Sequence, residues 1–260
     1  MMNVVQFTML LLIPAIVARE ECAAPVNVLW LPIGDSITWG CNGPSLGDCH
    51  NDSAGYRVPL ALALTQHPLG PSNCMGFNVR TMGTLMTGPP YVPQDWLRHE
   101  GHPAYQINMI EDILGQSLRS SPQPPDLITI HIGTNDCNVN MSTADMEANM
   151  NSLLGEIKVR APEAQVFLAD LLSTGFKQQM EECIIAFNNL IPQIVGNWAA
   201  QGMAIHHVTV FDTMQPGCGA DPNYPEHDFC GEDQMHPTSA GYPRMASAFA
   251  LSILRNFNVA

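Results

Sequence analysis

Apolar, β-rich runs alternate with segments of helical periodicity along this chain, and the alternation limits the possible folds more than any other feature. The strand-like runs are Val26–Ile33, Phe77–Thr81, Leu127–Ile132, Gln165–Ala169 and Ala204–Val210. Helical periodicity is seen over Tyr56–Thr65, Tyr105–Leu118, Ser142–Val159 and Phe176–Trp198, and a last helix is expected after Thr238. Near-continuous apolar strands separated by helices are typical of a parallel sheet that is covered on both faces. We therefore predict an α/β fold, a three-layer α/β/α sandwich around a central parallel sheet of about five strands.

The amino-acid composition excludes several classes of partner. The chain of 260 residues carries 24 Asp and Glu against 10 Lys and Arg, a formal net charge of −14. A surface of this charge repels phosphate backbones and anionic lipids, so we expect no nucleic acid and no membrane as partner of the mature chain. With 46% hydrophobic residues and no repeat or long linker, the chain is predicted to form one domain and to be a monomer.

The first 18 residues have the pattern of a secretory signal peptide. They carry no charge and contain the apolar run 9–18, which is too short to span a membrane. The small residue Ala18 precedes the first charges, so we predict cleavage after Ala18 and a mature domain of residues 19–260 that is secreted and extracellular. The segment lacks a basic start, and a retained anchor helix is the alternative interpretation.

All eight cysteines follow the predicted cleavage site. An even number of cysteines in a secreted chain indicates disulfide bonds, and short loops make Cys41–Cys49 and Cys218–Cys230 the first pairs to expect. A structural zinc site is disfavoured because the thiols are scattered and no C-x-x-C motif is present. Two N-x-[ST] sequons, at Asn51 and Asn140, are compatible with a glycoprotein.

Polar motifs follow three of the predicted strands and precede the last helix. In open parallel sheets, ligands bind beyond the carboxyl ends of the strands, so these motifs mark the expected site. The motifs are Gly34-Asp35-Ser36 after the first strand, Gly83 after the second, Gly133-Thr134-Asn135-Asp136 after the third, and Asp233-Gln234-Met235-His236 before the final helix.

Ser36, His236 and Asp233 are the residue types that nucleophilic catalysis needs. Ser36 is expected on a strand-to-helix turn, where the helix end directs free N–H groups at developing charge. A serine hydroxyl needs a base to remove its proton, and His236 is the candidate base. Asp233 precedes His236 by three residues, a spacing at which its carboxylate can bind the Nδ1–H of the ring and fix the tautomer. Alone, Gly-Asp-Ser is more often a helix N-cap and Asp-x-x-His a local turn contact, but their occurrence together at strand ends favours catalysis.

Acyl transfer also needs hydrogen-bond donors for the oxyanion of the tetrahedral intermediate. The Ser36 N–H, the Gly83 N–H and the side-chain amide of Asn135 are the expected donors. A turn with positive φ at Gly83 and an Asx-turn at Asn135 are the alternative interpretations.

In their order and content, these motifs resemble the four blocks of the SGNH, or GDSL-type, hydrolases. The resemblance spans about residues 27–250 and is carried by Gly34-Asp35-Ser36-Ile37-Thr38, Gly83, Gly133-Thr134-Asn135-Asp136 and Asp233-Gln234-Met235-His236. It implies a flavodoxin-like fold and a Ser-His-Asp mechanism that needs no cofactor. Ser36 would be the nucleophile, His236 the base, Asp233 the carboxylate that orients it, and Gly83 and Asn135 the oxyanion donors.

Three segments carry a narrower resemblance, to carbohydrate esterase family three, whose members include acetylxylan esterases. They are Gly55-Tyr56-Arg57, His99–Tyr105 and Asp233–Tyr242. The resemblance implies a secreted serine esterase that removes short acyl groups, chiefly acetyl, from polysaccharide, so an acylated carbohydrate or another small ester is the expected substrate. A cysteine-rich insertion between Trp39 and Asn51 departs from that family. A lipase or phospholipase, a broad carboxylesterase and a non-catalytic carbohydrate-binding protein therefore stay as alternatives.

The remaining chemistry-bearing residues are given structural interpretations. His99, Glu100 and His102 lack the helical spacing of H-E-x-x-H zinc sites and are expected in a loop that walls the cleft. The acidic segments are predicted to be solvated surface rather than calcium ligands, so no metal is expected. Three aromatic side chains have the chemistry either to stack on a sugar ring or to line the core: Trp39, Tyr91 and Trp96.

Overall fold

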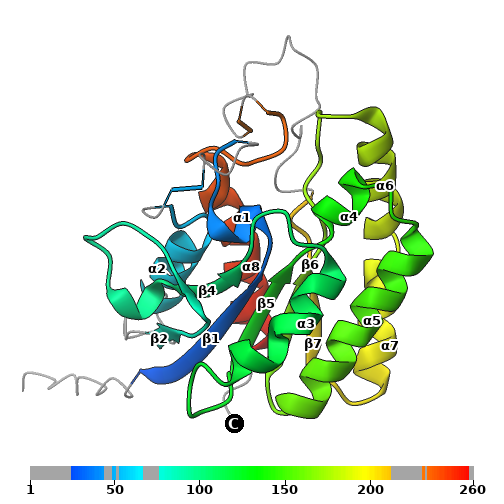
Figure 1. The fold of residues 1–260 in the computed structure, drawn as a ribbon. Coiled ribbons are helices and arrows are strands. Elements are labelled where there is room, and N and C mark those ends of the chain that lie inside the picture. The colour runs from blue at the N-terminus through cyan, green and yellow to red at the C-terminus, as the bar shows by residue number, and fades with distance from the viewer. Residues whose placement is uncertain are drawn as a thin grey trace, which may run out of the picture.

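The computed structural model describes residues 25–43, 49–50, 53–66, 76–211, 230–231 and 233–257. Within these residues, a seven-stranded sheet lies between two layers of helices (Figure 1). The predicted leader (residues 1–18), Asn51 and Cys218 fall outside the described residues. Across the ranges that the structure describes, no helix is both long enough and apolar enough to cross a bilayer.

The sheet is mostly parallel, and its first strand is central. The strands are β1 (Val26–Gly34), β2 (Phe77–Thr81), β3 (Leu85–Met86), β4 (Arg98–Gly101), β5 (Leu127–His131), β6 (Gln165–Ala169) and β7 (Ile205–Val208). On one side of β1, β2 pairs with its first half and β4 with its end, and β5 pairs along the other side. β6 and β7 continue the parallel order, and β3 pairs antiparallel with β4. The predicted three-layer architecture is confirmed, and the carboxyl ends of β1, β4 and β5 meet at one edge.

Helices bury both faces of the sheet. One face is covered by α3 (Ile107–Leu118), α5 (Thr143–Arg160), α6 (Gln178–Asn188) and α7 (Ile191–Ala200), and the other by α2 (Arg57–Gln66) and α8 (Gly241–Asn256). Successive β1 side chains alternate between the two cores, because a strand directs neighbouring residues to opposite faces. Leu31 and Ile33 pack under the first group of helices, and Trp30 under the second. Apolar side chains dominate both cores, and the polar motifs of the site lie at the carboxyl edge of the sheet.

Three short helices sit in the connections. They are α1 (Ser36–Trp39), η2 (Gln94–Trp96) and α4 (Thr134–Asn138). α1 and α4 start directly after β1 and β5, so their first residues lie at the carboxyl edge of the sheet.

Two sequence expectations need correction. The helix predicted over Phe176–Trp198 is two helices, α6 and α7, because Pro192 in the first turn of α7 lacks the N–H that a continuous helix would use. The strands β3 and β4 were not predicted. β4 has the sequence Arg-His-Glu-Gly, and His99 and Glu100 are buried in it through hydrogen bonds rather than apolar contact.

Disulfides close two of the connections. Cys41 is bonded to Cys49, as predicted, which closes the segment after α1. Cys137 of α4 is bonded to Cys183 of α6, a pair 46 residues apart that short-loop reasoning did not select. Cys230 is also disulfide-bonded, and the pairing predicted for it involves Cys218, which lies outside the described residues.

Candidate active site

The turn from β1 into α1 has room only for glycine. A Cβ atom at Gly34 would lie 2.1 Å from Thr38 Oγ1 and 2.3 Å from the carbonyl oxygen of His131. The constraint is therefore space, imposed by the contact of α1 with the neighbouring strand. As a result, Ser36 becomes the first residue of α1 at the carboxyl edge of the sheet.

Asp35 caps α1 from the protein interior. Its Oδ1 accepts a hydrogen bond from the Ile37 N–H at 2.9 Å. Burial raises the pKa of the Asp35 carboxyl from 3.8 to about 6, against the opposing effects of the Ile37 bond and of His236. Among the described residues, Asp35 Oδ2 has no hydrogen-bond partner. The charge on Asp35 therefore changes just below neutral pH.

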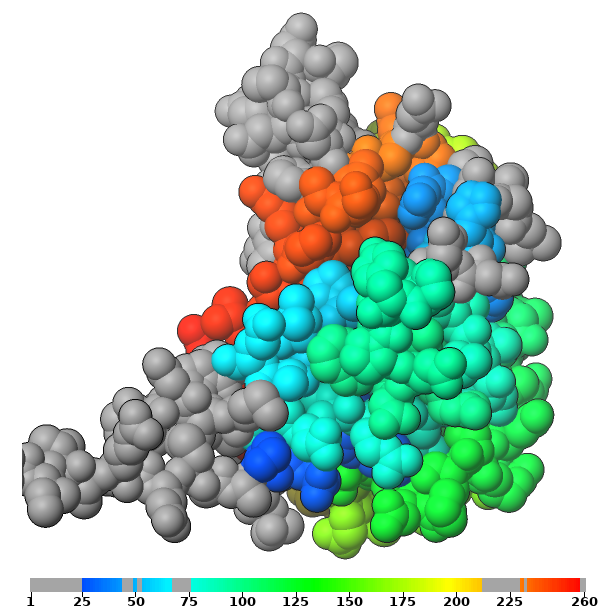
Figure 2. All heavy atoms as spheres, turned by 90° about the vertical axis from the view of Figure 1, so that its left-hand side faces the viewer, coloured from blue at the N-terminus to red at the C-terminus, as the bar shows by residue number. Residues whose placement is uncertain are grey.

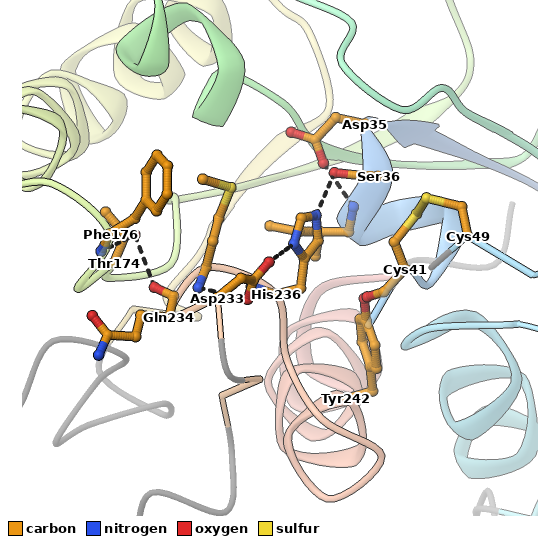
Figure 3. Close-up of polar contacts among 12 residues, drawn as sticks. Asp35, Ser36, Cys41, Cys49, Thr174, Phe176, Asp233, Gln234, His236 and Tyr242 are labelled. Carbon is orange, nitrogen blue, oxygen red and sulfur yellow. Dashed lines mark hydrogen bonds and ion pairs between the residues drawn. A yellow bond between two sulfur atoms is a disulfide. The ribbon is translucent and has the colours of Figure 1, made fainter. Parts of the chain in front are cut away.

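Ser36, His236 and Asp233 form one chain of hydrogen bonds (Figure 3). Ser36 Oγ lies 2.7 Å from His236 Nε2, and His236 Nδ1 lies 2.5 Å from Asp233 Oδ2. Burial alone would raise the pKa of the Asp233 carboxyl, but hydrogen bonds from the ring and backbone of His236 and from the Met235 N–H outweigh it, so the pKa is lowered. An ionised Asp233 accepts the Nδ1–H, which leaves Nε2 free to accept a proton from Ser36.

The loop that carries Asp233 and His236 is held by its own backbone and by the segment after β6. Asp233 Oδ1 accepts hydrogen bonds from the N–H groups of Met235 and His236, each at 3.1 Å. The carbonyl oxygen of Gln234 accepts a hydrogen bond from Thr174 Oγ1 at 2.9 Å. The end of the sheet thus positions the histidine, although 200 residues separate it from Ser36 in the sequence.

Asn135 lies in the first turn of α4, next to the same edge. Gly133 precedes it with a φ of 130°, a conformation that favours glycine. Asn135 Nδ2 donates a hydrogen bond to the carbonyl oxygen of Tyr105 at 3.0 Å. One of its two amide hydrogens is used in this bond, and the other stays available.

A cavity of about 370 Å³ opens at these residues. We call it the first cavity. It is lined by Ser36, Gly43, Cys49, Pro103, Ala104, Asn135, Asn138, Phe176, Met235 and His236. The structure therefore brings Ser36, His236 and Asn135 together around one space, and Asp233 stands behind the histidine.

Gly83 does not line this cavity, contrary to the sequence expectation. Its N–H donates a hydrogen bond to Ser120 Oγ at 3.0 Å, and it packs against the backbone of His99. The reason is the unpredicted β4, which lies between the segment after β2 and the end of β1. With φ at 141°, Gly83 fits the alternative interpretation of a structural turn glycine.

Ala104, which the sequence analysis did not select, lies in the wall instead. Its φ of 65° is in the left-handed region, which is uncommon for a residue with a side chain. A hydrogen bond from the Tyr105 N–H to the carbonyl oxygen of His102 closes the turn around it. Because alanine gives no signal of a positive φ, the residue type does not mark position 104 in the sequence. Strained backbone at a cavity wall marks a candidate functional position.

Buried titratable groups surround the turn, and burial shifts the pKa of each toward its uncharged form. Burial lowers the pKa of His131 to about 4. Burial raises the pKa of Asp136 to about 6, although the hydrogen bonds that Asp136 accepts from the Ile107 N–H act in the opposite direction. Burial raises the pKa of the Asp35 carboxyl in the same way. The space below Ser36 is therefore poorly solvated, which strengthens each hydrogen bond at the site.

Arg57 fixes the far end of α1. Its buried guanidinium donates hydrogen bonds to the carbonyl oxygens of Thr38 and Trp39 at 2.9 and 3.1 Å, and also to those of Thr87 and Leu97. Burial lowers its pKa to about 9. Arg57, which the sequence marks only through the family resemblance, thus ties α1 to the segment before β4.

His99, Glu100 and His102 make protein contacts in and after β4. His99 Nε2 lies 2.8 Å from Thr87 Oγ1. The Glu100 carboxylate accepts a hydrogen bond from Thr84 Oγ1 at 2.9 Å and lies 2.7 Å from His102 Nε2. Within the part of the chain that the structure describes, no three His, Cys, Asp or Glu side chains are grouped to hold a metal ion.

Solved structures share this fold. A family 3 carbohydrate esterase from Clostridium thermocellum is 24% identical with a TM-score of 0.67, over 88% of this chain and 96% of its own. A carbohydrate esterase family 3 structure from Talaromyces cellulolyticus is 18% identical with a TM-score of 0.67. The match covers 88% of this chain and 97% of that one. A catalytic mutant of an acetylxylan esterase from Geobacillus stearothermophilus is 19% identical with a TM-score of 0.60. The match covers 91% of this chain and 96% of that one.

The family model identifies the class of protein. Residues 33–244 match the model of the GDSL-like Lipase/Acylhydrolase family, and this range contains every residue of the site described above. The protein is a hydrolase of carboxylic esters. The chain belongs to the GDSL-like Lipase/Acylhydrolase family. No curated protein matches the sequence significantly.

The raised pKa of Asp35 predicts a specific pH dependence of stability. Because the folded-state pKa of about 6 lies above the ordinary value of 3.8, the stabilising contribution of the uncharged carboxyl is complete below about pH 4 and is lost as the pH rises through about 6. The unfolding free energy of wild type, relative to Asp35→Asn, is expected to fall by up to about 3 kcal/mol between pH 4 and 7. Urea unfolding of both proteins measures this, and parallel pH profiles would contradict it.

Proposed function

We propose that the protein is a serine esterase that hydrolyses short-chain acyl esters through an acyl-enzyme on Ser36. The observation that carries this proposal is the pair of hydrogen bonds that links Ser36 Oγ through the His236 ring to Asp233 at the wall of the first cavity. A binding protein would have no need of an aligned nucleophile, base and carboxylate.

In the proposed first half-reaction, Ser36 Oγ attacks the carbonyl carbon of the ester while His236 Nε2 takes its proton. The tetrahedral intermediate then collapses, the bond to the alcohol breaks, and the alcohol leaves with the proton from His236. In the second half-reaction, water attacks the acyl-enzyme and gives a proton to His236, which returns it to Ser36 Oγ as the acid leaves. Asp233 holds the ring and stabilises the imidazolium in both steps.

We propose three donors for the oxyanion: the backbone N–H groups of Ser36 and Ala104 and the amide of Asn135. All three residues line the first cavity. The Ala104 N–H donates to no acceptor within the described residues, and Asn135 keeps one amide hydrogen beside its bond to the Tyr105 carbonyl. Ala104 thus replaces Gly83 in the role expected from the sequence.

The proposed substrate is an acetylated polysaccharide. The overall likeness to family 3 carbohydrate esterases and to an acetylxylan esterase supports this substrate class. Gly43 and Cys49 line the first cavity, and the Cys41–Cys49 disulfide holds Cys49 there, which favours a short acyl group.

We further propose that the protein acts outside the cell. The disulfides Cys41–Cys49 and Cys137–Cys183 are typical of proteins from oxidising compartments. The apolar start of the sequence, with Ala18 before the first charges, supports export by a cleaved signal.

Hydrolysis of p-nitrophenyl esters tests the reaction and the acyl preference together. Wild type is expected to cleave the acetyl ester faster than the butyryl ester and the butyryl ester faster than the octanoyl ester. Ser36→Ala and His236→Ala are each expected to lower kcat by at least about 10³-fold, because the removed groups act as a unit. Their melting temperatures by circular dichroism should stay close to that of wild type. Retention of more than about a tenth of the wild-type turnover would contradict the assigned roles.

Two asparagines on α4 provide a matched test of oxyanion stabilisation. Asn135→Ala is expected to lower kcat for p-nitrophenyl acetate by about 10²- to 10³-fold with a smaller change in KM, because the donor acts on the transition state. Asn138, which lines the same cavity and accepts a hydrogen bond from Lys177 Nζ, is the control, and Asn138→Ala should keep kcat within about twofold. Equal losses in both variants would show a general effect of α4 rather than a donor role.

A further inference from the structure

A second cavity, of about 410 Å³, opens beside the first one. Its walls come from the end of α1, the start of α2, the loop 89–92 and the start of α8. Figure 2 faces this side of the molecule, where the cyan residues of α2, the blue-green residues near position 90 and the orange start of α8 lie side by side. No residue proposed above for catalysis lines the second cavity.

One short segment separates the two cavities. Gly43 and Cys49 line the first cavity, whereas their chain neighbours Asn42 and His50 line the second. The Cys41–Cys49 disulfide joins the two ends of this segment. The linings of the two cavities therefore meet at Asn42–Gly43 and again at Cys49–His50.

The segment is anchored on both sides. The hydroxyl of Tyr242, at the start of α8, donates a hydrogen bond to the carbonyl oxygen of Cys41 at 2.6 Å (Figure 3). Trp39 Nε1 donates a hydrogen bond to the carbonyl oxygen of His50 at 3.3 Å. Hydrogen bonds from α8 and α1 therefore hold Cys41 and His50, at the two ends of this segment.

The described residues that line the second cavity are mostly neutral and offer flat apolar surfaces. Among the described residues that line it, none is Asp, Glu, Lys or Arg, in a chain with 24 acidic and 10 basic residues. Apolar faces come from three prolines and Tyr91, and hydrogen-bonding groups from Asn42, Ser53 and Ser239. Flat apolar faces beside neutral hydrogen-bonding groups match a neutral sugar ring, which presents C–H faces and hydroxyl edges.

Of the aromatic residues singled out in the sequence, only Tyr91 is among the described residues that line the second cavity. The Trp39 indole is bound to His50, as described above, and Trp96 Nε1 donates a hydrogen bond to the carbonyl oxygen of Val79 at 3.1 Å. Tyr91 is 86% exposed and lines the second cavity. An exposed tyrosine at a cavity is suited to bind a ring face, because it offers a large contact area at low entropic cost.

We propose that the second cavity binds a sugar residue of an acylated oligosaccharide whose ester occupies the first cavity, with Tyr91 stacked on that sugar. This assignment rests on the esterase function proposed above and adds to it a specificity subsite. The ester of an oligosaccharide then gains binding energy from the second cavity, whereas a small ester does not reach it.

Tyr91→Ala tests the subsite through a ratio of substrates. We measure kcat/KM for acetylated xylo-oligosaccharides of four to six residues, acetylated xylose and p-nitrophenyl acetate. Relative to p-nitrophenyl acetate, Tyr91→Ala is expected to lower kcat/KM for the oligosaccharides by about 3- to 10-fold, mainly through KM, and to leave the ratio for acetylated xylose unchanged. Tyr91→Phe keeps the ring and should restore the oligosaccharide ratio. The control is Val159→Ala, at a side chain that is 77% exposed on α5, away from both cavities.

The outcomes separate this proposal from the esterase proposal. If wild type hydrolyses p-nitrophenyl acetate but gains nothing from a longer sugar chain, or if Tyr91→Ala leaves the oligosaccharide ratio unchanged, the sugar subsite is overturned and the esterase assignment stands. If Tyr91→Phe loses as much as Tyr91→Ala, stacking is overturned as the mode of binding. If wild type hydrolyses none of these esters, the esterase proposal fails first.

Discussion

The site depends on the absence of a side chain at residue 34. Because a Cβ atom there would lie 2.1 Å from Thr38 Oγ1, only glycine lets α1 start directly at the end of β1. Asp35 then caps α1 from below, and Ser36 stands at the carboxyl edge of the sheet. All other parts of the site, from Asn135 on α4 to the His236 loop, are placed against this fixed serine by the ends of the neighbouring strands.

Buried titratable groups with shifted pKa values lie beneath the turn that carries Ser36. Burial shifts the pKa values of Asp35 and Asp136 up to about 6 and that of His131 down to about 4, so His131 is neutral at about pH 7 and the two carboxyls take up protons on mild acidification. Asp233 differs because it accepts hydrogen bonds from His236 and Met235, and its pKa is lowered. The carboxylate behind the histidine therefore stays ionised to a lower pH than Asp35 and Asp136, which suits a group that stabilises an imidazolium.

Much of this arrangement is predictable from the sequence, because strand ends in a parallel sheet converge. The five strands follow from their apolar runs, and the convergence of strand ends places Ser36 and Asn135 at one edge. The Asp233–His236 loop precedes the last helix instead, and its residue types and three-residue spacing predict its role. β4 is not predictable in this way, since its polar residues carry no apolar alternation and are buried only through specific hydrogen bonds. Because β4 is not predicted from the sequence, Gly83 after β2 becomes the expected oxyanion donor. The chain in fact continues through β4 to Ala104 at the cavity, and the positive φ of Ala104 depends on a turn that its residue type does not reveal.

The central claim, that Ser36 is an activated nucleophile, is tested most directly by covalent labelling. A fluorophosphonate transfers its phosphonyl group to an activated serine oxygen and releases fluoride, and peptide mass spectrometry then locates the adduct. The account predicts a single adduct on the peptide that contains Ser36, and its loss in His236→Ala, because that variant lacks the base. An adduct on a different serine, or undiminished labelling of Ser36 in His236→Ala, would contradict it.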